Sequence, residues 1–224
     1  MRRGIAYLVT VLIIASGCAV ESTSHPTSST PAPRTQAPAA RTVALDPAQA
    51  KRLKRTMVPL IQVMDHPRPL NQVKVGVIDE PDINAASAGD GEFYVTTGLL
   101  QKANDQQLLA VLAHEIAHDD LRHVAKAQRL NAGLNIGMVI LDQIIPGSGN
   151  LTPVVGTAIA RSYSRKEEYQ ADQHGVVLLE RVGQPKEVMI STLTCLMQTE
   201  GTGGGGFFST HPGTDDRIEA LRKS

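Results

Sequence analysis

The sequence has no tryptophan, and aromatic residues make up only 3 % of its 224 positions. Any hydrophobic core must therefore consist of Leu, Val, Ile, Met and Ala side chains, which a domain of about 170–180 residues can still supply. Neither charge is in excess, because 22 acidic residues balance 22 basic ones. Without a long-range field of one sign, the chain is not expected to bind nucleic acid or to select acidic substrates.

Cysteine is scarce as well, since Cys18 and Cys195 are the only two. Cys18 follows a basic start, an apolar stretch and a small-residue pair, an order typical of an export signal. A Cys directly after Ala-Ser-Gly also resembles a bacterial lipidation site. We expect residues 1–18 to be a lipoprotein signal peptide, with Cys18 anchoring the exported protein to the periplasmic or extracytoplasmic face of a bacterial membrane. An ordinary signal peptide is the alternative; with Cys18 lipidated, no disulfide framework is expected.

Residues 19–45 differ in composition from the rest of the chain, because they are rich in Ser, Thr, Pro and Ala. Such a segment cannot bury enough apolar surface to offset the entropy that it would lose on ordering. We expect a disordered tether here, followed by one folded domain over residues 46–224. The domain starts where Asp46 can cap a helix whose first residue is Pro47.

Patterns of apolar residues predict an α+β domain in which helices dominate. Residues 73–78 alternate in polarity and residues 92–97 follow a Gly-containing turn, so both segments are expected to be strands. Together they suggest a small antiparallel sheet. Helical patterns predict helices over 47–64, 105–129, 133–145, 151–182, 185–198 and from Thr214 onward.

The segment from His114 to His118 has the pattern HExxH, and it falls within the expected helix over 105–129. Residues four positions apart share one helix face, so both imidazoles can point at one metal ion. Glu115 lies beside the first imidazole and can reach a water on that metal. Bound zinc lowers the pKa of such a water, and Glu115 can take its proton and later pass it to the leaving amine. Two surface histidines on an amphipathic helix are the alternative.

A catalytic zinc site usually has three protein ligands, so a third must come from elsewhere. His123 is near in sequence, but the metzincin pattern needs its histidine at the next position, which is Val124. Glu168 is the better candidate, because Asp172 lies four residues on, on the same helix face, and can orient a ligand imidazole. Glu167 is the rival ligand, and a solvated acidic face is the alternative for this pair of glutamates.

These segments together resemble the HtpX-like and CAAX-prenyl-endopeptidase family of gluzincin metallopeptidases over most of residues 70–222. The matches beyond HExxH are Asn84-Ala85 with Tyr94-Val95 and Gly98-Leu99-Leu100, Ser164-Arg165 with Glu168, Ala171 and Asp172, and Thr210-His211-Pro212 with Asp216-Arg217-Ile218. The resemblance implies a mostly helical, zincin-like domain with a small antiparallel sheet beside the HExxH helix, one Zn²⁺ per chain and Glu168 as the third ligand. Many members carry several transmembrane helices, and none is expected here after the signal, so the chain resembles the small soluble or lipid-anchored branch.

Two residues of the C-terminal segment are candidates for the chemistry. His211 can approach the zinc, either to stabilise the oxyanion or to cap the metal in a closed state. Arg217 can bind substrate carbonyls or the oxyanion. The alternatives are that His211 shapes a turn with Pro212, and that Arg217 pairs with Asp215 or Asp216.

The sequence therefore predicts a zinc metalloendopeptidase that is held at a membrane of the cell envelope. An extended substrate can pair with the strand over 92–97, which gives affinity with little sequence preference, and an ordinary edge strand is the alternative. Unfolded or misassembled envelope proteins are the substrates that the resemblance and the tether imply. The rival function is a non-catalytic peptide-binding or chaperone-like lipoprotein on the same fold, although a pure binder has no need of Glu115.

Overall fold

The structure is a computed structural model, and the residues that it describes are 45–123, 126–130, 135–141, 152–155, 158–200, 206–212 and 214–224. The expected signal peptide over 1–18 and almost all of the expected tether over 19–45 lie outside these ranges and stay predictions. Within the described ranges, no helix combines the length and the apolar character that crossing a membrane requires.

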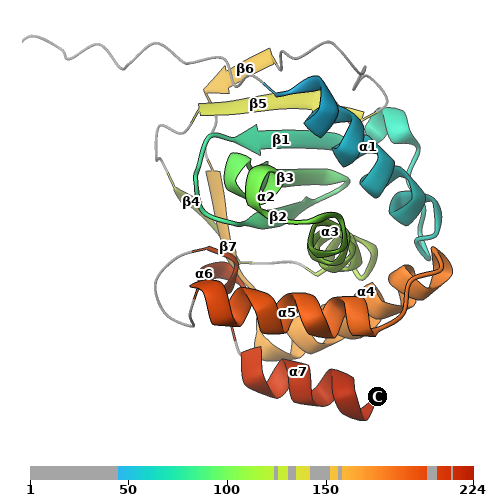
Figure 1. Cartoon of the computed structure of the whole chain (residues 1–224). Coiled ribbons are helices and arrows are strands. Elements are labelled where there is room, and N and C mark those ends of the chain that lie inside the picture. The colour runs from blue at the N-terminus through green and yellow to red at the C-terminus, as the bar shows by residue number, and fades with distance from the viewer. Residues whose placement is uncertain are drawn as a thin grey trace, which may run out of the picture. The chain divides into compact units, whose positions relative to one another are not determined.

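The main helices begin where short polar side chains cap them. Asp46 accepts a hydrogen bond from the Ala48 N–H at 2.8 Å, which confirms the expected helix start at Pro47. Asn104 and Ser164 each form a capping box with the residue three positions on. The helices are α1 (Pro47–Gln62), η1 (Leu70–Gln72), α2 (Thr97–Lys102), α3 (Asp105–Asp120), α4 (Arg165–Arg181), α5 (Glu187–Glu200), α6 (Phe207–Thr210) and α7 (Thr214–Lys223) (Figure 1).

Five strands form one mixed sheet in the described part of the chain. Their order is β2-β3-β1-β5-β6, so β2 and β6 are its edges. β1 and β3 are parallel, and the other neighbours are antiparallel. A separate antiparallel ladder joins β4 to β7. The strands are β1 (Lys74–Ile78), β2 (Ala85–Gly89), β3 (Glu92–Thr96), β4 (Lys126–Leu130), β5 (Asn135–Ile140), β6 (Thr152–Val155) and β7 (Ala158–Ser162).

The α+β class is as expected, but the expected antiparallel pairing of β1 with β3 is wrong, because these strands run parallel. The reason is β2, whose residues Ala-Ala-Ser-Ala-Gly carried no strand pattern. β2 joins β3 through a tight turn in which Gly89, Asp90 and Gly91 all have positive φ, a conformation that glycine favours. The additional reversal at this turn returns β3 in the direction of β1.

The helix that carries HExxH is shorter than the sequence suggested. It was expected over 105–129, but α3 ends at Asp120. Arg122 has a φ of 54°, which lies outside the right-handed helical region and turns the chain away from the helix axis. Residues 126–130 then form β4.

Two other segments that were expected to be helices contain strands. The apolar stretch over 133–145 contains β5, and the segment expected as one helix over 151–182 contains β6 and β7 before α4 begins at Arg165. A short apolar run suits a buried strand as well as a buried helix, so periodicity alone did not separate the two.

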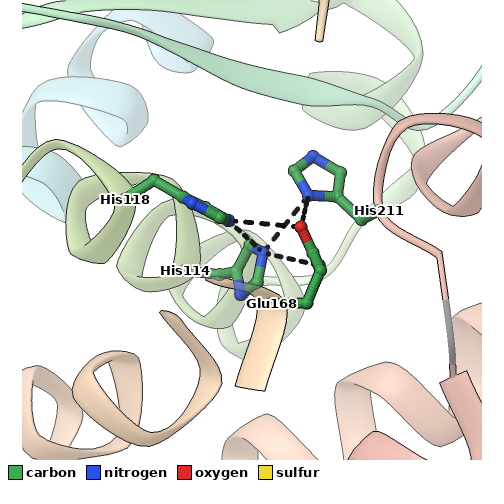
Figure 2. A group of neighbouring side chains, drawn as sticks. All are labelled: His114, His118, Glu168 and His211. Atoms are coloured by element: carbon green, nitrogen blue, oxygen red, sulfur yellow. Dashed lines mark hydrogen bonds and ion pairs between the residues drawn. The ribbon is translucent and has the colours of Figure 1, made fainter. Parts of the chain in front are cut away.

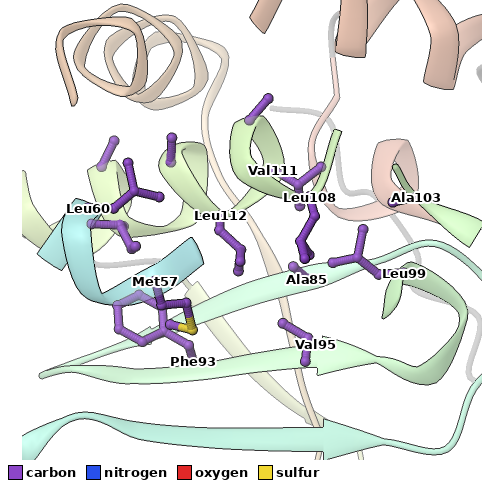
Figure 3. Close-up of a cluster of buried hydrophobic side chains, with 14 of the residues drawn as sticks. Met57, Leu60, Ala85, Phe93, Val95, Leu99, Ala103, Leu108, Val111 and Leu112 are labelled. Carbon is purple, nitrogen blue, oxygen red and sulfur yellow. The ribbon is translucent and has the colours of Figure 1, made fainter. Parts of the chain in front are cut away.

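The hydrophobic core lies between α1, α3 and the sheet (Figure 3). It is aliphatic apart from three phenylalanines, as the composition required. Met57 and Leu60 of α1 and Leu112 of α3 meet Phe93 and the other inward side chains of the sheet. On its remaining sides α3 is covered by α4 and α5 (Figure 1). A helix enclosed in this way can keep polar groups only where they meet one another.

Candidate metal centre

The HExxH residues lie in the stretch of α3 that is enclosed by other elements. Residues 110–120 are all buried, because β2, α4 and α5 pack around this part of the helix. His114, Glu115 and His118 are therefore only 0–1 % exposed. Burying three ionisable groups costs free energy unless each has a partner nearby. Their partners come from α4 and from the segment after α6.

α4 brings Glu168 to the imidazoles. The capping box of Ser164 and Glu167 turns the Glu167 carboxylate back to the helix start, where it accepts the Ser164 N–H at 2.7 Å. The next residue, Glu168, faces α3 and is fully buried. Gly175 makes room for α5 beside α3, because a Cβ at this position would lie 2.8 Å from Cε of Met189. The structure therefore places Glu168, and not Glu167, beside the imidazoles.

Four side chains converge between α3, α4 and the end of α6 (Figure 2). Nε2 of His114 lies 3.1 Å from Nε2 of His118. The carboxylate oxygens of Glu168 lie 3.4 Å from each of these nitrogens. Nδ1 of His211 completes the group, at 3.3 Å from Nε2 of His114 and 3.1 Å from Oε1 of Glu168. We call these four residues the buried cluster.

The buried cluster fits a tetrahedral zinc ion in its distances and in its chemistry. Zinc bonds of about 2.1 Å set the ligand atoms about 3.4 Å apart. Five contacts in the cluster are 3.1–3.4 Å long, and one ligand atom from each of the four residues lies within 4.8 Å of the others. Imidazole nitrogen and carboxylate oxygen are both ligands that zinc accepts. Several converging nitrogens cannot all donate to one another, whereas each can offer a lone pair to a shared cation. The four residues can therefore hold one metal ion.

Asp172 and Arg217 lie directly behind the buried cluster. Asp172, one helical turn after Glu168, places Oδ1 3.0 Å from Nδ1 of His114. The guanidinium of Arg217 donates to both oxygens of Asp172 at 2.7 Å and lies 2.6 Å from Oε2 of Glu168. It also donates to the backbone carbonyl of His211 at 3.0 Å. One buried cation thus holds two acidic side chains of α4 and the segment that carries His211.

Burial and neighbouring charges shift the pKa values in the buried cluster in opposite directions. Burial lowers the pKa of His114, but hydrogen bonds to Asp172 and Glu168 outweigh it and raise this pKa to about 9. For His118 burial prevails and holds the pKa well below its ordinary value. Burial alone would raise the pKa of Glu168, but the charge of His211 and hydrogen bonds from the imidazoles lower it. Glu168 is therefore a carboxylate and His118 a neutral imidazole, the forms in which both can bind a metal.

Glu115 lies between the buried cluster and the edge of the sheet. Its Oε2 accepts a hydrogen bond from the N–H of Ser87 on β2 at 2.8 Å. Its Oε1 is 3.2 Å from Nε2 of His211, and the same nitrogen is 3.5 Å from the carbonyl oxygen of Ala85. The carboxylate thus has one oxygen on the sheet edge and the other toward the cluster.

His118 has two further neighbours, His123 and Tyr163. Its Nδ1 lies 2.9 Å from Nδ1 of His123, whose pKa is lowered by burial. Tyr163 stacks on the His118 ring, with ring centroids 3.6 Å apart and planes 21° from parallel. The Tyr163 hydroxyl donates to the carbonyl of Ser87 at 3.1 Å. Tyr163 thus contacts the face of the His118 ring, and His123 contacts its Nδ1.

A second group of histidine and carboxylate side chains lies at the end of α3. Oδ2 of Asp120 is 2.7 Å from Nε2 of His174, and Asp65 is 3.9 Å from the same nitrogen. The backbone N–H groups of Asp65 and His66 donate to the two oxygens of Asp120 at 2.7 and 2.8 Å. Asp65 also pairs with Arg181 at 2.7 Å. We call Asp65, Asp120 and His174 the Asp120 cluster; it ties the end of α1 to α3 and α4.

The family is decided by a match that runs through nearly all of the described fold. Residues 47–224, from the first residue of α1 to the end of the chain, match the model of peptidase family M48. The chain belongs to peptidase family M48. This confirms the resemblance to HtpX-like metallopeptidases that the motifs indicated, while its lipid-anchored branch stays a prediction.

Relatives within family M48 include bacterial and plant proteins. The mitochondrial metalloendopeptidase OMA1 of Arabidopsis thaliana is 31 % identical over 153 residues, which cover 67 % of this chain and 31 % of OMA1. The protease HtpX of Xanthomonas euvesicatoria is 31 % identical over 193 residues, which cover 66 % of this chain and 65 % of HtpX. An HtpX homologue of Chlorobium phaeobacteroides is 29 % identical over 170 residues, 58 % of this chain and 57 % of that protein. The chain therefore spans less than two thirds of the length of each of these three relatives.

The M48 fold corrects two expectations about the site. Arg217 does not pair with Asp215 or Asp216, because its guanidinium is turned inward to Asp172 and Glu168. The strand over 92–97 is not an edge, because β3 lies between β2 and β1. The edge strand beside α3 is β2.

Three residues at the site were not found from the sequence. Ser87 lies in a strand without a sequence pattern, so nothing indicated its contact with Glu115. Tyr163 directly precedes the N-cap of α4, which fixes its place beside His118, but only the packing of α4 on α3 shows this. His123 was considered only as a metal ligand; its spacing from His118 was a signal, and the turn at Arg122 was the missing information.

Proposed function

We propose that this M48 chain is a zinc-dependent metalloendopeptidase in which His114, His118 and Glu168 hold the metal and Glu115 is the general base. The observation that carries the proposal is the convergence of two imidazole nitrogens and the two oxygens of the Glu168 carboxylate, with contacts of 3.1–3.4 Å and the Glu115 carboxylate beside them. Membership of a peptidase family supports it. So does the similarity to OMA1 of Arabidopsis, which is named a metalloendopeptidase.

His114, His118 and Glu168 would hold the zinc ion, which would supply a Lewis acid for the scissile carbonyl and would lower the pKa of a water. Glu115 takes a proton from that water and returns it to the leaving amine. The N–H of Ser87 fixes Oε2 of Glu115, so Oε1 is the oxygen that moves the proton. Arg217 acts indirectly, because its contacts with Glu168 and Asp172 keep the third ligand charged and oriented.

To His211 we assign the role of a cap on the site. It fills the fourth place of the buried cluster, and its other nitrogen contacts the Oε1 of Glu115 that has to accept the proton. A catalytic zinc site keeps one position open for water or substrate. His211 therefore has to withdraw before cleavage. In the sequence, α6 and His211 follow a glycine-rich segment.

An extended substrate adds to β2 rather than to β3. The backbone groups of Ala85 and Ser87 that face the buried cluster now contact His211, Glu115 and Tyr163. A peptide in extended conformation can donate its backbone N–H groups to the carbonyls of Ala85 and Ser87 in place of His211 and Tyr163, with little dependence on its side chains, while the Ser87 N–H stays on Glu115. This mode suits unfolded chains, which have free backbone groups.

Unfolded or misassembled proteins of the cell envelope are the substrates that we assign to this activity. The order of basic, apolar and small residues before Cys18 supports export and a lipid anchor at that cysteine. The Ser-, Thr- and Pro-rich segment over 19–45 supports a tether that lets the domain reach such substrates.

The first test compares wild type with Glu115→Gln on casein, an unfolded protein substrate, after loading both with zinc. Glutamine keeps the size of the side chain but cannot take a proton, so cleavage should fall by about 10²- to 10⁴-fold. Zinc content should be the same in both proteins. Equal cleavage by the zinc-loaded variant would show that Glu115 is not the base. If wild type binds peptides tightly without cleaving any of them, the non-catalytic alternative is correct.

A second test concerns His211. If His211 caps the site, His211→Ala should cleave casein faster than wild type while it still binds one zinc ion, since three ligands remain. An unchanged rate would contradict the cap, and a slower rate at full zinc content would assign His211 to the oxyanion instead.

A further inference from the structure

His123 is attached to His118 twice, although it lies outside α3. Arg122, with its φ of 54°, turns the chain back after the helix. The backbone N–H of His123 then donates to the carbonyl oxygen of His118 at 3.0 Å. The imidazole of His123 reaches Nδ1 of His118 with its own Nδ1, at 2.9 Å. The turn therefore delivers one specific ring nitrogen to the back of a ligand of the buried cluster.

The position of the proton in this contact follows from the two nitrogens of His118. Its Nε2 faces the buried cluster, 3.1 Å from Nε2 of His114. A nitrogen that binds a cation must offer a lone pair, so the only proton of His118 is then on Nδ1. A hydrogen bond between two nitrogens needs one donor and one acceptor, which makes Nδ1 of His123 the acceptor. His123 is therefore uncharged in the metal-bound protein and carries its proton on Nε2, on the side of the ring away from Nδ1.

We propose that His123 is a positioning residue that, as an uncharged acceptor, fixes the tautomer and the ring orientation in which His118 binds the metal. This rests on the proposed function, because it takes His118 as a metal ligand. A histidine ligand normally donates its second N–H to a partner of this kind, and loss of that partner weakens metal binding.

The stacking of Tyr163 cannot do this work alone. It holds the plane of the His118 ring, at 3.6 Å between centroids. A ring that is turned over by 180° within the same plane stacks equally well, but it puts carbon atoms where Nδ1 and Nε2 should be. A hydrogen bond at Nδ1 does distinguish the two orientations.

The two imidazoles of the HExxH motif thus have different partners. Nδ1 of His114 lies against the carboxylate of Asp172, whereas Nδ1 of His118 lies against a neutral ring. Three carboxylates, those of Glu115, Glu168 and Asp172, already lie in or beside the cluster, and the guanidinium of Arg217 binds two of them. An uncharged acceptor fixes His118 without the further repulsion that another buried carboxylate would bring.

The test compares His123→Asn and His123→Leu in the full chain. The two side chains have nearly the same shape, but asparagine can place an uncharged oxygen where Nδ1 of His123 lies, whereas leucine has no acceptor. Zinc affinity is measured by competition with a chelator at neutral pH. We expect His123→Leu to bind zinc about 10- to 100-fold more weakly than wild type, and His123→Asn to stay close to wild type. Equal affinity in all three proteins would overturn the proposal, and so would an equal loss in both variants.

A measurement on the wild-type protein tests the proposal even if a variant does not fold. Nitrogen NMR of the zinc-loaded protein with labelled histidines should show the proton on Nδ1 of His118 and none on Nδ1 of His123. The opposite arrangement would overturn the proposal even if His123→Leu proved unstable. The proposed function fails in a different way: if wild type binds no zinc, or Glu115→Gln cleaves normally, the metallopeptidase itself is wrong. If zinc and Glu115 behave as proposed while His123→Leu matches wild type, only the role of His123 is wrong.

Discussion

The buried cluster and the Asp120 cluster are built from the same kinds of residue on the same two helices. The first takes His114 and His118 from α3 and Glu168 from α4, together with His211. The second takes Asp120 from α3 and His174 from α4, together with Asp65. In both, a histidine nitrogen and a carboxylate oxygen from facing helices lie within 3.4 Å of each other.

The two clusters differ in what else reaches their oxygen and nitrogen atoms. In the buried cluster the converging atoms have one another as neighbours, apart from Oε2 of Glu168, which also pairs with Arg217 at 2.6 Å, and all four side chains are fully buried. In the Asp120 cluster both oxygens of Asp120 already accept backbone N–H groups. Its third member, Asp65, is half exposed and pairs with Arg181.

A metal site therefore depends on unused lone pairs and not on residue type alone. The buried cluster gathers lone pairs that a cation can bind together, which is costly for the protein without a cation. In the Asp120 cluster the donors of the protein itself already neutralise the carboxylates. The Asp120 cluster acts as a clamp between the end of α1, α3 and α4. It places Asp120 at the C-terminus of α3, where the helix dipole opposes a negative charge. The specific donors have to outweigh that cost.

The largest effect that would sharpen this comparison is expected from Glu168→Ala set beside Glu167→Ala. Glu168→Ala deletes a metal ligand. Loss of a hydrogen-bond partner of a ligand can weaken zinc binding about 100-fold, and loss of the ligand itself should weaken it more. Glu167 only caps α4, and its removal should cost about 1 kcal/mol of stability with zinc retained. Metal analysis after dialysis and thermal unfolding measure the two outcomes. Full zinc retention in Glu168→Ala would move the third ligand to Glu167 or to a histidine.

Asp120→Ala should show the opposite pattern, with stability lost and zinc kept. The substitution leaves the N–H groups of Asp65 and His66 and the ring of His174 without their acceptor. We expect a loss of about 3 kcal/mol in the free energy of unfolding. Urea denaturation measures it, and metal analysis should still find one zinc ion per chain. Loss of zinc from the folded variant would mean that the clamp and the metal site are not separate.

Acid should weaken the Asp120 clamp in a defined range. Burial by itself raises the pKa of Asp120, but hydrogen bonds from His174, Asp65 and His66 outweigh it and lower this pKa from 3.8 to about 2. Because the folded pKa is below the unfolded one, the contribution is complete above about pH 4 and is lost as the pH falls toward 2. Wild type without metal should therefore lose about 2 kcal/mol more than Asp120→Asn over this range. Parallel pH profiles for the two proteins would show that Asp120 does not carry this charge effect.

The smallest effect is expected from Asp65→Asn, at the exposed side of the clamp. Asp65 keeps its backbone N–H on Asp120 and loses its ion pair with Arg181 and its longer contact with His174, at 3.9 Å. Such a surface pair contributes about 0–1 kcal/mol. The unfolding midpoint in urea should shift slightly or not at all, and zinc content should be unchanged. A loss as large as that of Asp120→Ala would assign the clamp to the ion pair and not to the backbone donors.

Local signals in the sequence were sufficient for the elements that carry most of the site. The i, i+4 spacing of His114 and His118 is a property of one helix, and α3 begins at Asp105 as the helical pattern predicted. The start of α4 at Ser164 was not predicted, because one helix was expected over 151–182. The same spacing placed Asp172 on the face of Glu168. The choice of Glu168 over Glu167 depended on this face, and the structure places Glu168 in the buried cluster.

Only the tertiary structure decided what the local signals left open. The apolar segment that forms β5 fits a strand or a helix equally, and pairing with β1 selects the strand. β2 has almost no side-chain pattern, and its place as an edge strand comes from the hairpin with β3 and from packing on α3. Arg217 turns inward because of how the helices pack. His123 contacts His118 because the chain reverses after α3. Spacing along a chain determines which side chains share a face, whereas the meeting of two faces depends on the packing of the whole domain.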